Sequence, residues 1–140
     1  MENTSVRGSR FVNLRSDYGS TWRGPLLLRY CTCEPTGDNS AVINGSYSGQ
    51  HDFGYVCYMP DTITVDGLHI DDAALPADSP GPAFFADFNP ERTDSKYTEA
   101  YPYIITERVI LRDVTTESGK KLRLSDNPVM VRGVEVVRQP

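Results

Sequence analysis

The sequence predicts an all-β protein built as a solenoid, in which short parallel strands stack coil upon coil. One apolar pattern carries this prediction, because it occurs four times, in residues 26–33, 63–70, 109–116 and 129–136. In each copy the apolar residues occupy positions one, three, six and eight, so an alternation of period two is interrupted by one extra residue. The composition agrees, since ten prolines and eleven glycines favour turns and the many Thr, Val and Tyr residues favour strands over helices.

Each copy of the pattern is expected to form two short strands that meet at a bend. The extra residue resets the alternation, so both strands point their apolar side chains the same way. Gly67 and Gly133 occupy the bend position, where an unusual φ is least costly for glycine. Thr64, Asp66 and His69 should be more exposed than their neighbours. The side chains predicted to be almost fully buried are Ile63, Val65, Leu68, Ile70, Leu111, Val114, Val131 and Val134.

A second family of short apolar segments alternates with the bent elements. The chain therefore runs through a strand, a variable arm, a bent strand pair and a turn, and then begins again. A solenoid explains such a repeat, because every coil must present the same apolar columns to its neighbours. We expect three to four coils in one domain, residues 10–140, after a polar tail or lead-in, residues 1–9. The second family comprises residues 11–14, 41–44, 83–86 and 121–124.

The stacking of coils also predicts which outward side chains meet. Coils about 4.8 Å apart place equivalent residues in columns. The outward fourth position holds Arg29, Asp66, Arg112 and Arg132. Chain order then puts Asp66 between two arginines and makes Arg112 face Arg132. Such a solvated stripe is expected to contribute little to stability.

On these residues, the chain resembles part of a right-handed parallel β-helix of the pectate-lyase-like superfamily. The likeness rests on residues 63–70, 109–116, 129–136 and 118–125, and it is one of pattern over residues 11–137. That superfamily contains polysaccharide lyases, glycoside hydrolases, esterases and phage adhesins that act on acidic or neutral glycans. The resemblance implies a β-helix with long arms on one side, a polysaccharide ligand and an extracellular or periplasmic location.

Charge and hydropathy argue against two classes of partner. The net charge is −5 and the chain has no basic cluster, so we expect no nucleic-acid partner. No apolar run approaches the roughly 20 residues that a membrane helix needs, so we expect no membrane partner. The first ten residues lack the apolar core of a signal peptide.

The three cysteines are interpreted as core residues. Cys31 and Cys33 fall on inward columns, where a thiol behaves as a small hydrophobic group, and Cys57 makes their number odd. A zinc site or a redox pair is the alternative. Zinc would need a second Cys or His pair at ligand spacing, which neither His51 nor His69 supplies. We therefore expect no metal and no cofactor.

The variable arms are the predicted site of function, because they all leave the coil at one corner. They are residues 15–24, 46–61, 89–108 and 125–128. Seven of the eight tyrosines and the only tryptophan lie in them. Aromatic rings with polar tips suit sugars, whose apolar faces stack while their hydroxyls form hydrogen bonds. The alternative is that these rings close small cores beneath long loops. The candidate carbohydrate-binding residues are Trp22, Tyr47, His51, Asp52, Tyr55 and Tyr58.

Three acidic motifs are candidates for catalysis. His51 and Asp52 are adjacent and could act as an acid–base pair, although neighbouring residues of an extended chain point to opposite sides. The pair Asp71–Asp72 is similar to the acidic pair of polygalacturonases, but turn chemistry explains it more simply. For a calcium-dependent lyase the loose candidates are Asp66, Asp87, Asp113 and Arg112.

The preferred function is carbohydrate recognition by a non-catalytic portion of a glycan-active protein. One alternative is a polysaccharide hydrolase or lyase with catalytic residues of an unfamiliar kind, and another is a structural solenoid segment for assembly. Val134 and Val136 are expected on a last rung with nothing above them, which favours homo-oligomers through uncapped ends. Otherwise Arg138 and Pro140 blunt that edge, as charges and prolines do on edge strands.

Overall fold

The computed structural model describes residues 1–14, 19–37, 40–45, 53–87, 103–128 and 130–140. Within these ranges the chain forms ten strands in three sheets, every strand pair is parallel, and there is no helix. None of the described segments is therefore a helix that could span a membrane. The predicted all-β class and parallel pairing are confirmed.

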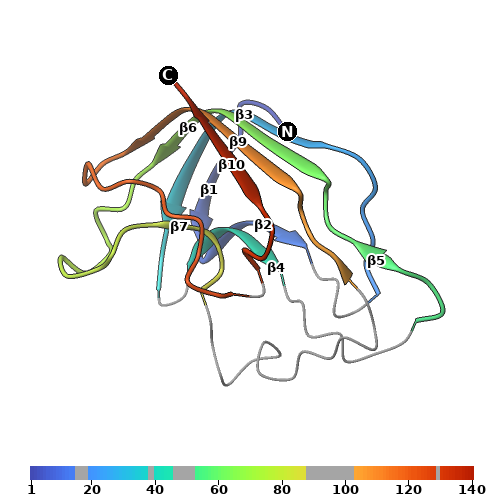
Figure 1. The fold of residues 1–140 in the computed structure, drawn as a ribbon. Helices are drawn as coiled ribbons and strands as arrows, with labels where there is room; N and C mark the ends of the chain where they lie inside the picture. Colours follow the sequence, from blue (N-terminus) through green and yellow to red (C-terminus); the bar gives the residue numbers. More distant parts are fainter. Residues whose placement is uncertain (15–18, 38–39, 46–52, 88–102, 129) are drawn as a thin grey trace.

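The largest sheet has the strand order β1, β3, β6, β9, β10 (Figure 1). Its three long strands are the first three copies of the apolar pattern, and they stack in the predicted register. Leu26 lies opposite Ile63, and Ile63 lies opposite Val109. The strands are β1 (Ser5–Gly8), β3 (Leu26–Pro35), β6 (Thr62–Ile70), β9 (Arg108–Thr116) and β10 (Glu135–Gln139).

A bend divides each long strand of this sheet, as predicted. Tyr30, Gly67 and Asp113 share one column, and their φ angles are 52°, 81° and 51°. At Gly67 a side chain would be crowded as well as strained, because an added Cβ would lie 3.0 Å from Cδ1 of Tyr30. The extra residue of the pattern thus adopts the left-handed backbone conformation. Glycine occupies this position in β6, where the Tyr30 ring leaves little room for a side chain.

The fourth copy of the pattern does not form a bent strand pair, so this prediction is wrong. Residues 130–133 form a turn, and the side chain of Met130 is buried in the core. Strand β10 begins only at Glu135 and pairs Val136 with Val109. Val131 and Val134 are half-buried rather than fully buried, because neither lies on the inward ladder. Val114 is also half-buried, since no strand in the described ranges continues the sheet beyond it.

The second sheet confirms the second family of strands. It contains β2 (Arg10–Leu14), β4 (Ala41–Gly45) and β7 (Ala83–Phe85), in that order. Arg123 adds a further rung through a parallel bridge to Ala83, and its carbonyl accepts a hydrogen bond from the Phe84 N–H at 2.8 Å.

A third, smaller sheet pairs β5 (Cys57–Tyr58) with β8 (Tyr103–Ile104). The chain visits the large, second and third sheets in the same recurring order. It runs through β3, β4 and β5, then through β6, β7 and β8, and then returns to the large sheet in β9.

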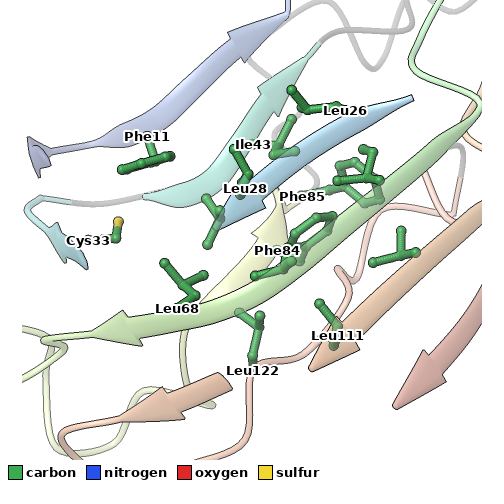
Figure 2. Close-up of a cluster of buried hydrophobic side chains, with 14 of the residues drawn as sticks. Phe11, Leu26, Leu28, Cys33, Ile43, Leu68, Phe84, Phe85, Leu111 and Leu122 are labelled. Carbon is green, nitrogen blue, oxygen red and sulfur yellow. The ribbon is translucent and has the colours of Figure 1, made fainter. Parts of the chain in front are cut away.

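The hydrophobic core lies between the large and second sheets. Figure 2 shows Leu28, Leu68 and Leu111 of the large sheet facing Ile43 and Phe84 of the second sheet. The four inward residues predicted in β6 are all buried, and so is Leu111 of β9. Thr64, Asp66 and His69 of β6 are half-buried.

The three cysteines are free and buried, as expected for core residues. Burial raises the pKa of the Cys33 thiol to about 11 and also raises the pKa of Cys57. Both groups are therefore neutral thiols at physiological pH.

Residues 5–8 of the amino-terminal segment form a strand of the large sheet. Strand β1 pairs with the second half of β3, so that Ser5 lies opposite Thr32 and Gly8 opposite Pro35. Val6 packs against the core. A polar segment can extend the sheet in this way because the ladder is formed by the backbone.

Candidate functional site

Three of the six predicted site residues are described, and they come from two successive arms. Trp22 precedes β3, while Tyr55 and Tyr58 lie before and within β5. Tyr47, His51 and Asp52 lie outside the described residues.

Backbone hydrogen bonds bring the two arms together beside the third sheet. The Trp22 N–H donates to the carbonyl oxygen of Tyr58 at 2.9 Å. The Tyr58 N–H in turn donates to Oγ1 of Thr21 at 3.0 Å. On the next rung the Met59 N–H donates to the Ile104 carbonyl at 2.8 Å. The arm that contains Trp22 therefore stacks on β5 much as β5 stacks on β8.

The Trp22 side chain is exposed and held in place. Its relative exposure is 40%, and its Nε1–H donates to the Pro25 carbonyl oxygen at 3.3 Å. Beside it, the guanidinium carbon of Arg23 lies 4.8 Å from the centre of the Tyr58 ring, a cation–π contact. One ring of the site is thus open to solvent, and the other is partly covered by a cation.

A hollow of about 390 Å³ lies next to these rings. Asn13 lies at its edge, and its Oδ1 accepts a hydrogen bond from Nδ2 of Asn44 on the neighbouring strand at 3.1 Å. The hollow therefore combines aromatic surface with amide and hydroxyl groups, the chemistry that holds a polar ring compound. Its lining residues are Asn13, Leu14, Ser20, Thr21, Trp22, Tyr58 and Met59.

Tyr55 joins the two arms. Its ring is exposed, but its hydroxyl donates to the carbonyl oxygen of Gly19 at 2.6 Å, and its neighbour is the Phe53 ring. It does not line the hollow. These contacts fix one arm against the other, so for Tyr55 the geometry favours loop closure.

Sequence reasoning missed the polar part of this hollow. Asn13, Ser20 and Thr21 carry no periodic signal. The one available clue was the pairing of Asn13 with Asn44, which follows from aligning the second strand family. Arg23 was missed because its importance depends on a contact between two arms.

Asp71 and Asp72 both accept hydrogen bonds from the protein itself. The buried carboxylate of Asp72 accepts hydrogen bonds from the Ser118 N–H at 2.7 Å and from the Ser118 hydroxyl. Oδ1 of Asp71 accepts from the Ala73 N–H at 3.3 Å, as in a turn. Turn chemistry therefore accounts for Asp71, whereas Asp72 joins two segments that lie 46 residues apart in the chain.

The lyase candidates divide between two places, because Asp66 contacts Arg112 on the large sheet whereas Asp87 contacts Arg123 beside β7. Asp66 lies between two arginines, Asp87 binds Arg123, and Asp113 is at the exposed bend. Among the described residues no three acidic, histidine or cysteine side chains gather in a way that could hold a metal ion.

Comparison of the chain with models of protein families, with curated proteins and with solved structures found no match. The structure itself defines an all-β protein of parallel sheets. Beside its third sheet lies the hollow that Trp22 and Tyr58 help to line.

Proposed function

We propose that this protein recognises carbohydrate, and that its three sheets are the faces of a short right-handed parallel β-helix of the pectate-lyase-like kind. The recurring visit of the chain to the large, second and third sheets supports this fold, as does the parallel pairing throughout. The shared register of β3, β6 and β9 supports it further, because coils of a solenoid stack equivalent residues.

The exposed ring of Trp22 beside the hollow is the observation that carries the functional proposal. A sugar ring can stack its C–H face on the indole, while its hydroxyls form hydrogen bonds with the Asn13 amide and the Thr21 hydroxyl. The bond from Nε1 to the Pro25 carbonyl orients the indole before any ligand arrives. Less conformational entropy is then lost on binding.

The chain acts in this proposal as a non-catalytic portion of a glycan-active protein. A polysaccharide hydrolase or lyase is the second candidate. Glycosidic hydrolysis requires two carboxyl groups at a set separation. The described lining residues instead contribute aromatic, amide, hydroxyl and aliphatic groups, which is the chemistry of recognition.

A glycan array followed by calorimetry tests the proposal with one matched pair of variants. Trp22→Ala removes the exposed ring in the hollow. Tyr30→Ala removes another exposed aromatic ring, which lies at the bend of β3 on the large sheet. We expect Trp22→Ala to weaken binding at least about tenfold, or about 1.4 kcal/mol, and Tyr30→Ala to leave affinity unchanged.

Three results would count against this function. They are the absence of any bound glycan, equal losses in the two variants, and a melting temperature that falls in step with affinity. Reducing-sugar and unsaturated-product assays on each bound glycan address the second candidate, because turnover would make the protein an enzyme.

A further inference from the structure

The hollow beside the third sheet is lined by one amide whose orientation is fixed. Nδ2 of Asn44 donates to Oδ1 of Asn13 at 3.1 Å, between two neighbouring strands of the second sheet. The carbonyl oxygen of the Asn13 amide is therefore turned towards β4. Its amide nitrogen, which carries two N–H donors, is left for a ligand in the hollow that Asn13 lines. The pair thus makes Asn13 a donor rather than an acceptor towards the ligand.

The Thr21 hydroxyl supplies the complementary acceptor. Its Oγ1 accepts a hydrogen bond from the Tyr58 N–H at 3.0 Å and donates a long one to the Val56 carbonyl oxygen at 3.5 Å. A hydroxyl oxygen has two lone pairs, so one of them is left to accept from a ligand. The Trp22 Nε1–H is already bound to the Pro25 carbonyl oxygen, and the indole therefore offers a ligand its apolar face.

Part of the wall of the hollow is apolar, and its described lining residues carry no charge. The apolar part comes from Leu14, which packs against the core, and from Met59, which is buried. Arg23 is not a lining residue, and its guanidinium lies over the Tyr58 ring. A carboxylate in the hollow would lose water without gaining a cationic partner from the described wall, which is unfavourable. A neutral substituent with a methyl group suits these surroundings better.

We propose that the hollow selects sugars that carry an N-acetyl group, an inference that rests on the proposed function of carbohydrate recognition. The sugar ring stacks on Trp22, and the acetamido group takes the place of one ring hydroxyl. Its carbonyl oxygen accepts from the Asn13 amide nitrogen, and its N–H donates to Oγ1 of Thr21. Its methyl group packs against Leu14 and Met59, where removal of apolar surface from water is favourable. A plain hydroxyl at the same place lacks this methyl contact.

Saturation-transfer NMR and titration calorimetry of the full chain with methyl glycosides test the inference. The ligands are the glycosides of N-acetylglucosamine and N-acetylgalactosamine, those of the parent sugars glucose and galactose, and that of glucuronate as a charged comparison. We expect the acetyl methyl protons to receive strong saturation from the protein. Each acetamido sugar should bind at least about tenfold more tightly than its parent hexose, or about 1.4 kcal/mol. Glucuronate should bind no more tightly than glucose.

Asn13→Asp and Asn44→Asp remove the donor from the hollow by two routes. Asn13→Asp keeps an oxygen for Nδ2 of Asn44 and presents its second oxygen to the ligand. In Asn44→Asp the new carboxylate needs a donor, so the Asn13 amide turns and presents its oxygen to the hollow. A sugar hydroxyl can donate to that oxygen, whereas an acetamido carbonyl cannot. Both variants should therefore lower the ratio of acetamido-sugar to hexose affinity at least about fivefold.

Asn3→Asp is the matched control, because it makes the same change at an exposed residue beside β3 and should leave the ratio unchanged. Circular dichroism and thermal melting establish that each variant is folded. Equal affinities for acetamido sugars and their parent hexoses, or tighter binding of glucuronate, overturn this inference and leave the proposed function standing. A preference that survives in both Asn13→Asp and Asn44→Asp also overturns it. A chain that binds no sugar at all overturns the proposed function and this inference with it.

Discussion

The Asp66 carboxylate lies 3.4 Å from the Arg112 guanidinium, between two rungs of the large sheet. On its other side the same carboxylate oxygen lies 3.7 Å from Nε of Arg29. The predicted position of Asp66 between two arginines is thus confirmed. Arg112, however, donates from Nε to the side-chain oxygen of Gln139 at 2.8 Å, so the predicted contact with Arg132 is wrong. The shifted register of β10 is the reason.

Asp66→Asn should lower the free energy of unfolding by about 0.5–1 kcal/mol, because two guanidinium groups would then flank a neutral amide. Urea denaturation measures this loss at low salt and in about 1 M salt, where the Debye length falls to about 3 Å. We expect the loss to shrink at high salt. Glu34→Gln, at the exposed pair with Arg7, is the control and should cost less. An equal loss at both salt concentrations would contradict an ionic origin.

Leu28→Ala and Leu27→Ala form a matched pair that tests the register of the large sheet. Leu28 is fully buried and its neighbour Leu27 is 37% exposed. Removing the buried side chain should cost about 2–5 kcal/mol through lost transfer energy and the cavity that remains. Removing the exposed side chain of Leu27 should lower the free energy of unfolding by less than about 1 kcal/mol. Chemical denaturation of both variants decides the matter, and similar losses would mean that the inward column is misassigned.

Sequence alone predicted the columns of the large sheet, because an alternation with one phase reset reports directly which side chains point inward. It failed at the copy in residues 129–136, because its described residues, 130–136, form a turn and the start of β10. Apolar residues that cover the end of a core, such as Met130, follow no strand period. The strand at residues 5–8 was missed because it is held mainly by backbone pairing, which leaves no apolar pattern in the sequence.

The candidate site could be predicted only in part. The arms were expected to bring Trp22, Tyr47, His51 and Tyr55 together because they leave from one corner. Backbone hydrogen bonds do join the arms of Trp22 and Tyr58, whereas Tyr47 and His51 lie outside the described residues. The contributions of Asn13 and Thr21 depend on contacts across rungs. Such contacts are fixed by strand register, which the spacing of polar residues in a single sequence does not reveal.

Gly67→Ala should destabilise the protein by about 1–2 kcal/mol, the cost of a left-handed conformation for a residue with a Cβ. Its φ is +81°, and the new Cβ would lie 3.0 Å from the Tyr30 ring. Gly8→Ala is the control, because no atom lies within 4 Å of an added Cβ there. We expect the control to stay within about 0.5 kcal/mol of the wild type in thermal and urea denaturation. Equal effects would show that the bend column tolerates any small residue.

Asp87 should make stability depend on pH in the acid range. Hydrogen bonds from Arg123 lower its pKa, assisted by the Asp126 N–H, which donates to Oδ1 at 3.0 Å. These contacts hold residues 123–126 beside β7. Because the folded-state pKa lies below the unfolded value of about 3.9, the stabilisation is complete above that value. It is lost as the pH falls through the lowered folded-state pKa.

Urea denaturation of the wild type and Asp87→Asn from about pH 7 to about pH 3 tests this expectation. The variant should be less stable at neutral pH, and the difference should shrink as the wild-type carboxylate becomes protonated. Asp78→Asn, at an exposed loop carboxylate, is the matched control and should change little at any pH. A difference between the wild type and Asp87→Asn that stays constant into the acid range would mean that the Arg123 contact does not stabilise the charged form.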